Sequence, residues 1–416
     1  MLENLSGVGS TGRFASFDIG CIHMKQRLEA IVLAIVIGLT VSMSAQAATE
    51  PKFLSVGGNG RLVYEADQHG NTIPDFSHCG YMGGNADIPN APIQVVVSPT
   101  EGDNTQRIQT ALDYVASLPA NQVGIRGAVL LEKGQYRILG RLLMSASGVV
   151  LRGQGMGEEE TVLIAAGTDR RTLIRIAGNN DRTYLLDEPH RVIDEYVPVG
   201  AYSFRLNSAE GLKAGDVVNI IRPSTQAWIG RLGTDSFGGG LRGIFAWKPG
   251  SRDVVWDRVI RSIEGNRVTV DAPITTAIEA SLGGALLRSY SWPGRIHHVG
   301  VENLRCVSEF DSDNPKDENH SWMAVTIENA ESAWVRRIMT EHFAGSAVAI
   351  WESCKWITVQ DCVSLAPVSE HGGYRRHTFF TMGQLTLFVH CWSEFGRHDF
   401  SVGHCAAGPN AFVQCE

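Results

Sequence analysis

One short pattern of alternating apolar residues recurs through the last third of the chain and constrains the fold more than any other feature. Its copies lie at residues 297–306, 355–362, 385–391 and 410–415. Alternation with a period of two predicts β-strands. The recurrence of such strands at short intervals predicts coils that stack directly on one another. The chain is therefore expected to be all-β, wound as a single-stranded parallel β-helix.

The cysteines fit the same stacking. Cys362, Cys391 and Cys415 each close one copy of the pattern, so parallel strands in register would place them in a column about 4.8 Å apart. The seven cysteines after residue 47 are an odd number without zinc-type spacing, which favours buried thiols over a disulfide framework.

An amphipathic helix is expected ahead of the first coils. The run GDNTQRIQTALD at residues 102–113 begins with Asp103 and Asn104, either of which can cap a helix. Its apolar residues fall on one face before Pro119 ends the pattern: Ile108, Ala111, Leu112 and Val115. Short strands divided by glycines follow at 127–131, 136–138 and 148–152.

The runs GDNTQRIQTALDYV, GAVLLEKGQYRI and SGVVLRGQG resemble the amino-terminal cap and first coils of the pectate-lyase-like superfamily. The resemblance covers residues 100–165 and 296–416 and implies a right-handed parallel β-helix whose N-terminal helix caps the coils. It is specific for the fold and weakly specific for chemistry, because the superfamily contains lyases, hydrolases, epimerases and non-catalytic phage fibres.

The middle of the chain departs from the coil pattern. Strand-like runs at 212–221 and 263–270, the latter a hairpin around Gly265 and Asn266, predict an antiparallel elaboration packed on the coils. Trp228, Trp247 and Trp256 are expected mainly in its core. The predicted organisation begins with upstream residues and a signal peptide at 1–47, a leading loop region at 48–100, and the helix and first coils at 101–190. The elaboration follows at 191–295, and the coils with the candidate active site at 296–416. Further sequence is expected beyond Glu416.

Residues 24–47 have the features of a cleavable signal peptide. Lys25 and Arg27 precede a short apolar run and an Ala-Gln-Ala site at 45–47. Translation from Met24 and a secreted or periplasmic location are expected; a retained membrane anchor is the alternative. The net charge of −8 argues against binding to nucleic acid or to anionic membranes through overall charge, and we expect a monomer without membrane insertion of the mature chain.

Two Arg-His pairs stand out near the C-terminus. Arg376-His377 and Arg397-His398 are 21 residues apart, each just before a β-type run. Because that spacing is close to one coil, the pairs are expected side by side. Asn319-His320 and Glu341-His342 have similar positions, so several histidines are expected to form a line on one side of the coils.

These residues suggest elimination chemistry on an acidic polysaccharide. A lyase must neutralise a uronate carboxylate, remove the neighbouring proton and protonate the leaving oxygen. Arginine supplies a fixed charge that fits a carboxylate, while histidine and tyrosine supply protons. The predicted catalytic residues are His377, His398, Tyr374 and Arg397, with either histidine as base and Tyr374 as acid. The predicted substrate-binding residues are Arg375, Arg376, His371, Asn319, His320 and Asp399.

Other readings stay open. The acidic run at 309–313, with Asp317 and Glu318, is an alternative calcium site, but its spacing matches no recognised calcium loop and a metal-free mechanism fits the arginines and histidines better. A glycoside hydrolase on the same scaffold needs clustered carboxylates, of which Asp361 and Asp399 are the chief candidates after residue 340. A non-catalytic carbohydrate-binding rod is the third reading.

Overall fold

The computed structural model describes residues 53–236, 245–403 and 405–416. The chain divides into two compact units, residues 1–63 and 64–416. The described residues of the first unit include β1 (Leu54–Val56) and the first two residues of the strand with which it pairs, β2 (Leu62–Tyr64). Everything below concerns the second unit. The predicted signal segment, 24–47, lies outside the described residues. None of the helices among the residues described is long and apolar enough to cross a membrane.

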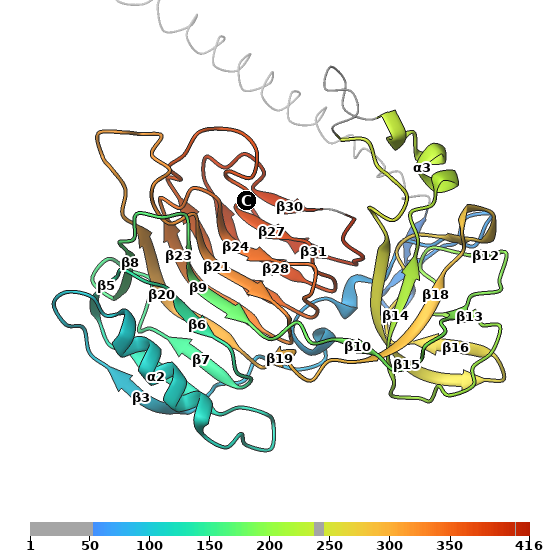
Figure 1. Ribbon diagram of the computed structural model, residues 1–416, viewed down its shortest axis with the longest axis horizontal. Coiled ribbons are helices and arrows are strands. Elements are labelled where there is room, and N and C mark those ends of the chain that lie inside the picture. Colours follow the sequence, from blue (N-terminus) through green and yellow to red (C-terminus); the bar gives the residue numbers. More distant parts are fainter. Residues whose placement is uncertain (1–52, 237–244, 404) are drawn as a thin grey trace, which may run out of the picture. The chain divides into compact units, whose positions relative to one another are not determined.

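A parallel sheet of twelve strands runs through the coils (Figure 1). Its main path pairs the same short segment of successive coils, and its second part pairs the segments just after it. The main path is β3 (Ile93–Val97), β4 (Gly127–Leu131), β7 (Val149–Arg152), β20 (Gly300–Ser308), β23 (Trp334–Glu341), β25 (Thr358–Gln360), β28 (Leu387–Val389) and β31 (Ala411–Val413). The second part adds β5 (Gly134–Ile138), β8 (Thr161–Ala165), β26 (Val363–Leu365) and β29 (Trp392–Ser393).

A second parallel sheet, of six strands, is built from the same coils. Its order is β30 (Phe400–Val402), β27 (Phe379–Thr381), β24 (Ser346–Ile350), β21 (Met323–Glu328), β9 (Thr172–Ala177) and β6 (Leu142–Met144). Because the chain adds strands to both sheets as it winds, the arrangement is a parallel β-helix, as the repeat predicts. The remaining parallel pair is β19 (Ile296–His297) with β22 (Ala330–Glu331).

Residues with positive φ stack on one another at one corner of the coils, inside β20 and β23 and just after β25, β28 and β31. Asn303, Arg337, Asp361, His390 and Gln414 each have a positive φ and each follows an in-register residue of the first sheet. Arg337 Nε donates to Asn303 Oδ1 at 2.5 Å, and the His390 ring lies 3.3 Å from Asp361 Oδ1 and 2.6 Å from Gln414 Oε1. These contacts offset part of the strain of a left-handed conformation in residues other than glycine.

The interior of the coils is apolar, with one helix against it. α2 (Thr105–Ser117) buries its four predicted apolar residues. Its N-cap residue is Asn104, which makes no side-chain capping bond, while Asp103 Oδ1 accepts from the Thr105 backbone N–H at 2.9 Å. Cys362 and Cys391 are buried and Cys415 packs against the same core. The predicted column is confirmed, and every cysteine that the structure describes is a free thiol.

The middle of the chain forms the predicted antiparallel sheet, here called the antiparallel sheet. Its strands are β10 (Thr183–Tyr184), β11 (His190–Arg191), β13 (Ser203–Arg205), β14 (Val217–Arg222), β15 (Val254–Glu264), β16 (Arg267–Val270) and β18 (Leu286–Ser291), beside the pair β12 (Tyr196–Val197) and β17 (Ile278–Glu279) and the helix α3 (Gln226–Leu232). The β15–β16 hairpin lies where Gly265-Asn266 predicts it. Trp228 and Trp256 are buried in its core and Trp247 packs against them.

Two expectations need correction. The leading region 48–100 is not loop throughout, because β3 pairs with β4 and begins the first parallel sheet within it. The antiparallel strands also begin at Thr183, ahead of the expected boundary at 191.

Candidate functional site

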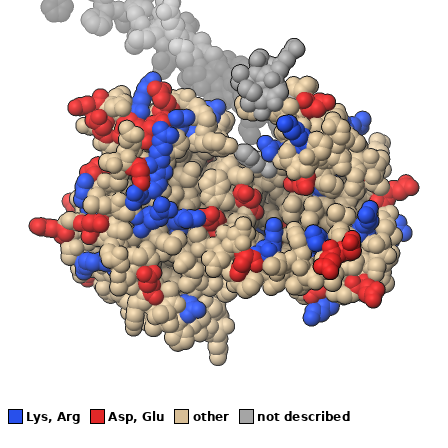
Figure 2. All heavy atoms as spheres, in the orientation of Figure 1, with Lys and Arg blue, Asp and Glu red and all other residues tan. Residues whose placement is uncertain are grey.

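A cleft of about 1230 Å³ lies between the six-stranded sheet and the antiparallel sheet. On the coil side it is lined by Arg175 of β9, Glu328 of β21 and Phe380 of β27. Trp351, just after β24, and His377, just before β27, line it as well. On the opposite side Arg182, Asn219, Arg252 and Trp292 face it. Figure 2 shows Lys and Arg side chains gathered in a column over the coil strands, with Asp and Glu side chains among them. The cleft lining combines aromatic surface with four arginines and with four carboxylates, those of Asp253, Asp257, Glu328 and Glu352. Aromatic rings and guanidinium groups are the side chains that an acidic sugar polymer would contact.

Tyr374, His377 and His398 form a cluster at the rim of the cleft. β27 pairs with β30 so that Phe379 lies opposite Phe400, which confirms that the spacing of 21 residues brings the two Arg-His pairs together. The rings of His377 and His398 have centroids 4.5 Å apart, and the Tyr374 ring lies 6.3 Å from that of His377. Tyr374 is 62% exposed. Two imidazoles and a phenol thus stand within reach of a polymer in the cleft, as proton transfer requires.

The three nearby arginines have different surroundings. Arg397 is exposed and donates from Nη1 to the Gly373 carbonyl at 2.8 Å. Arg375 is clamped by Glu318, whose Oε2 accepts from Nη2 at 2.7 Å, and its guanidinium lies 5.2 Å from the centre of the Trp322 ring. Hydrogen bonding to Arg375 holds the pKa of Glu318 below its usual range, so Glu318 stays charged and neutralises much of the arginine.

Arg376 points away from the cleft into protein. It is 9% exposed and its guanidinium donates to the Ser369 hydroxyl, the Ser369 carbonyl and the Phe395 carbonyl. Burial lowers the pKa of Arg376. These bonds fasten the loop that carries Tyr374 to the next coil, so Arg376 supports the cluster instead of offering its charge to a ligand.

The other predicted binding residues divide into exposed and buried. His371 and Asn319 are exposed on loops. Asp399 accepts a hydrogen bond from Ser393 Oγ at 2.6 Å and does not bond a histidine in the described part of the chain. His320 is completely buried, with Nδ1 2.8 Å from Ser308 Oγ and Nε2 3.1 Å from the Asp317 and Val368 carbonyls. We therefore leave His320 and Arg376 out of the proposed binding surface.

The expected line of four histidines is wrong. In the register of the six-stranded sheet, the position of His377 on the neighbouring coils is occupied by Ser346 and Met323. His342 instead follows the end of β23 with φ 66° and faces a different hollow. The loops before β21 and β24 differ in length from those before β27 and β30. Histidines that precede these strands in the sequence therefore do not occupy equivalent positions in space.

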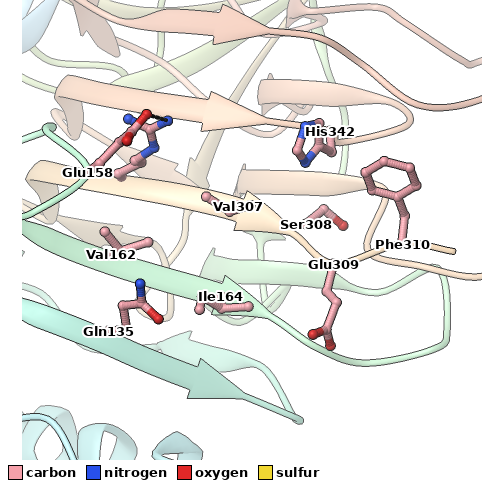
Figure 3. Close-up of a pocket in the computed structure, with 10 residues that line it drawn as sticks. Gln135, Glu158, Val162, Ile164, Val307, Ser308, Glu309, Phe310 and His342 are labelled. Carbon is pink, nitrogen blue, oxygen red and sulfur yellow. Dashed lines mark hydrogen bonds and ion pairs between the residues drawn. The ribbon is translucent and has the colours of Figure 1, made fainter. Parts of the chain in front are cut away.

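That second hollow measures about 430 Å³ and lies on the other sheet (Figure 3). Val162, Ile164 and Val307 form its apolar floor, with Glu309, Phe310 and His342 at one end. Burial lowers the pKa of His342, and its ring lies edge-on to Phe310 at 4.9 Å. Tyr374 and His377 line the larger cleft and do not line this hollow, so we favour the larger cleft.

A buried ionic cluster that the sequence did not reveal lies at the floor of the larger cleft. Asp257 of β15 contacts Arg295 Nη1 at 2.6 Å and Lys355 Nζ at 2.9 Å. Burial alone would favour neutral Asp257, but Lys355 and Arg295 outweigh it and hold the pKa of this carboxyl well below its usual range. Nearby, Arg258 is buried and donates to Gln384 Oε1 and to the Gly408 carbonyl. These bonds fix the antiparallel sheet to the coils and so set the width of the cleft.

The acidic residues considered for calcium are otherwise engaged. Glu309 pairs with Arg137, Glu318 with Arg375, and Asp317 accepts the backbone N–H groups of Asp311 and Asn319. In the described ranges there is no group of three or more His, Cys, Asp or Glu side chains arranged to hold a metal ion.

Comparisons with known proteins were made for the whole chain. No protein-family profile matches it, and no curated protein matches its sequence. Among solved structures it is similar to the tailspike gp49 of Pseudomonas phage LKA1, at 14% identity and a TM-score of 0.43 over 75% of this chain and 44% of that one. It is also similar to a tailspike of Acinetobacter baumannii bacteriophage AP22, in complex with capsular saccharide, at 11% identity and a TM-score of 0.30 over 76% and 51% of the two chains.

A polygalacturonase from Erwinia carotovora is similar at 10% identity and a TM-score of 0.31, over 80% of this chain and 64% of that one. The chain thus spans about half the length of the tailspikes and less than two thirds of the polygalacturonase. The strand register described above, and not these distant likenesses, defines the fold.

Proposed function

We propose that this protein is a polysaccharide lyase that cleaves a uronate-containing polymer by β-elimination in the larger cleft. The observation that carries the proposal is the cluster of Tyr374, His377 and His398 at the rim of a cleft whose walls carry four arginines. We take the coils to be right-handed and capped by α2, as in the pectate-lyase-like proteins, and the protein to be exported by the segment 24–47.

The proposed reaction uses the cluster for proton transfer. His377 or His398 accepts the proton from the carbon next to the uronate carboxylate. The electron pair left behind forms a carbon–carbon double bond as the glycosidic carbon–oxygen bond breaks, and Tyr374 donates its phenolic proton to the departing oxygen. Arg397, which is exposed beside the cluster, stabilises the negative charge that develops on the carboxylate. Arg375, His371 and Asn319 would contact sugars further along the polymer.

The test is incubation of the purified protein with a panel of uronate polymers while ultraviolet absorbance is followed. Elimination leaves an unsaturated sugar at the new end of the chain, which absorbs, and each cleavage also makes one reducing end. Equal yields of absorbing product and reducing ends are expected. No cleavage of any polymer in the panel, together with measurable binding, would favour the non-catalytic rod instead.

A glycoside hydrolase is the second candidate, because the cleft also exposes carboxylates. Glu328 and Glu352 line it, although Glu328 is engaged by Arg175, and hydrolysis needs two carboxyl groups flanking the bond. The same assay separates the two reactions. Reducing ends without an absorbing product would identify hydrolysis and would make these glutamates the candidates for its catalytic residues.

A further inference from the structure

Asn219 is an unusual residue in the wall opposite the coils. It lies in β14, in register with Asp257 of β15 on one side and Arg288 of β18 on the other. Its side chain is 1% exposed, yet it lines the cleft. A buried amide needs partners for both its oxygen and its nitrogen.

The oxygen of this amide is satisfied and its nitrogen is not. Oδ1 accepts from Arg182 Nη1 at 3.1 Å and from the Tyr184 hydroxyl at 3.4 Å. Two donors on Oδ1 fix the orientation of the amide, so Nδ2 must point the other way. Nδ2 is shielded from solvent and has no hydrogen-bond partner among the described residues. Such a donor is costly in the free protein and is satisfied when a ligand brings an acceptor.

Arg182 bonds Asn219 directly, and Arg295 pairs with Asp257, the residue opposite Asn219 on β15. The guanidinium groups of Arg182 and Arg295 lie 5.3 and 4.8 Å from the centre of the Trp292 ring. Arg295 is paired with Asp257, but its Nε has no partner within the part of the chain that the structure describes. Arg182 is exposed and makes no ion pair with a described carboxylate. The wall therefore presents an uncompensated charge beside two unused N–H donors.

From this arrangement we infer that the antiparallel sheet holds a second subsite, made by Arg182, Asn219 and Arg295, which binds the carboxylate of a uronate residue in the polymer. The inference rests on the proposed function, because it names the group recognised at the wall facing the catalytic cluster. A planar carboxylate offers acceptors that match both a guanidinium fork and an amide N–H. A neutral sugar would leave the charge of Arg182 without a counter-ion, so the subsite selects acidic polymers.

The experiment measures binding by titration calorimetry and needs no turnover. The probes are trisaccharides of galacturonate, mannuronate and glucuronate, a neutral cellotriose, and a sulfated galactan trisaccharide that lacks uronate. The variant is Arg182→Gln, which changes an exposed residue. The control is Arg261→Gln, which removes the same charge from an exposed position of β15 that does not line the cleft.

We expect Arg182→Gln to weaken binding of at least one uronate trisaccharide by roughly ten-fold, the loss of one charge-assisted hydrogen bond, while Arg261→Gln leaves it unchanged. Asn219→Ala should give a loss on the same probe. Unchanged affinity in Arg182→Gln, or an equal loss for cellotriose, would overturn the subsite. Tighter binding of the sulfated galactan than of every uronate would overturn the carboxylate assignment.

Failure of the proposed reaction would look different. If a uronate trisaccharide binds in a way that depends on Arg182 but no polymer gives an unsaturated product, the elimination reaction is rejected and the subsite is retained. If the protein gives an unsaturated product but Arg182→Gln binds every uronate trisaccharide as tightly as the wild type, the reaction is retained and the subsite is rejected.

Discussion

The floor and the rim of the larger cleft differ in the burial of their ionisable side chains. At the floor, Asp257, Arg295 and Lys355 are buried, and both cations pair with Asp257. At the rim, Tyr374, Arg397 and His398 are exposed. Removing one member of a buried ionic set leaves the other charges buried without a counter-ion, whereas water can solvate the partners that an exposed side chain leaves behind. The floor should therefore govern stability and the rim should govern activity.

The largest expected effect is at the floor. Asp257→Asn would leave Lys355 and Arg295 with insufficient negative charge, and we expect the free energy of unfolding to fall by about 3–5 kcal/mol, measured by chemical denaturation. Asp187→Asn, at an exposed position of the same part of the chain, should change it little. Equal stability of the two variants would show that the floor does not depend on this ion pair.

The ionic cluster around Asp257 also makes the free energy of unfolding depend on pH. Because the folded pKa of Asp257 is depressed, its contribution is fully present above the unfolded pKa of about 3.9 and is lost as pH falls toward the folded value. The stability difference between the wild-type protein and Asp257→Asn should therefore be constant near neutral pH and shrink in acid. A difference that grows on acidification would contradict the assigned charge state.

At the rim we expect the reverse pattern. His377→Ala and His398→Ala should each lower the cleavage rate, by roughly 10²-fold for the histidine that acts as base, with little change in the unfolding temperature. His69→Ala, an exposed histidine far along the chain from the cluster, is the matched control. Near-normal rates in both rim variants would remove the assignment of the cluster to catalysis.

The smallest effect separates the two rim arginines. Arg397→Gln should reduce kcat/KM by about ten-fold, because the exposed charge of Arg397 is available to the substrate. Arg375→Gln should change it less than two-fold, roughly within the spread of neutral surface changes, since Glu318 already pairs with Arg375. A larger loss for Arg375 would show that the substrate displaces Glu318.

The sequence repeat was sufficient to predict most of the parallel strands. Strands at 300–308, 358–360, 387–389 and 411–413 occur where alternation predicts them, because in-register stacking forces equivalent residues into equivalent places. The same rule correctly paired His377 with His398. It failed for His320 and His342, whose loops differ in length, so that counting residues no longer measures position in space.

The floor of the cleft was beyond prediction for another reason. Asp257 and Lys355 are 98 residues apart, and Asp257 and Arg295 are 38 apart. Neither contact follows from the repeat of the coils, because Asp257 belongs to the antiparallel sheet, which lies outside the repeat. Asn219 was missed likewise, because it lies in an ordinary apolar strand and only the arrangement of β14, β15 and β18 shows its amide facing the cleft.

The bonds of Trp256 and Arg258 have a consequence for biosynthesis. Trp256 Nε1 donates to the Ala407 carbonyl and Arg258 to the Gly408 carbonyl, partners about 150 residues later. A nascent chain leaving the ribosome thus contains its middle strands long before the residues that accept these hydrogen bonds are synthesised. Until residues 407 and 408 are synthesised, the Trp256 indole and the Arg258 guanidinium must be solvated by water or covered by a chaperone. Truncation before residue 407 would leave the contact between the antiparallel sheet and the coils incomplete and accessible to proteases.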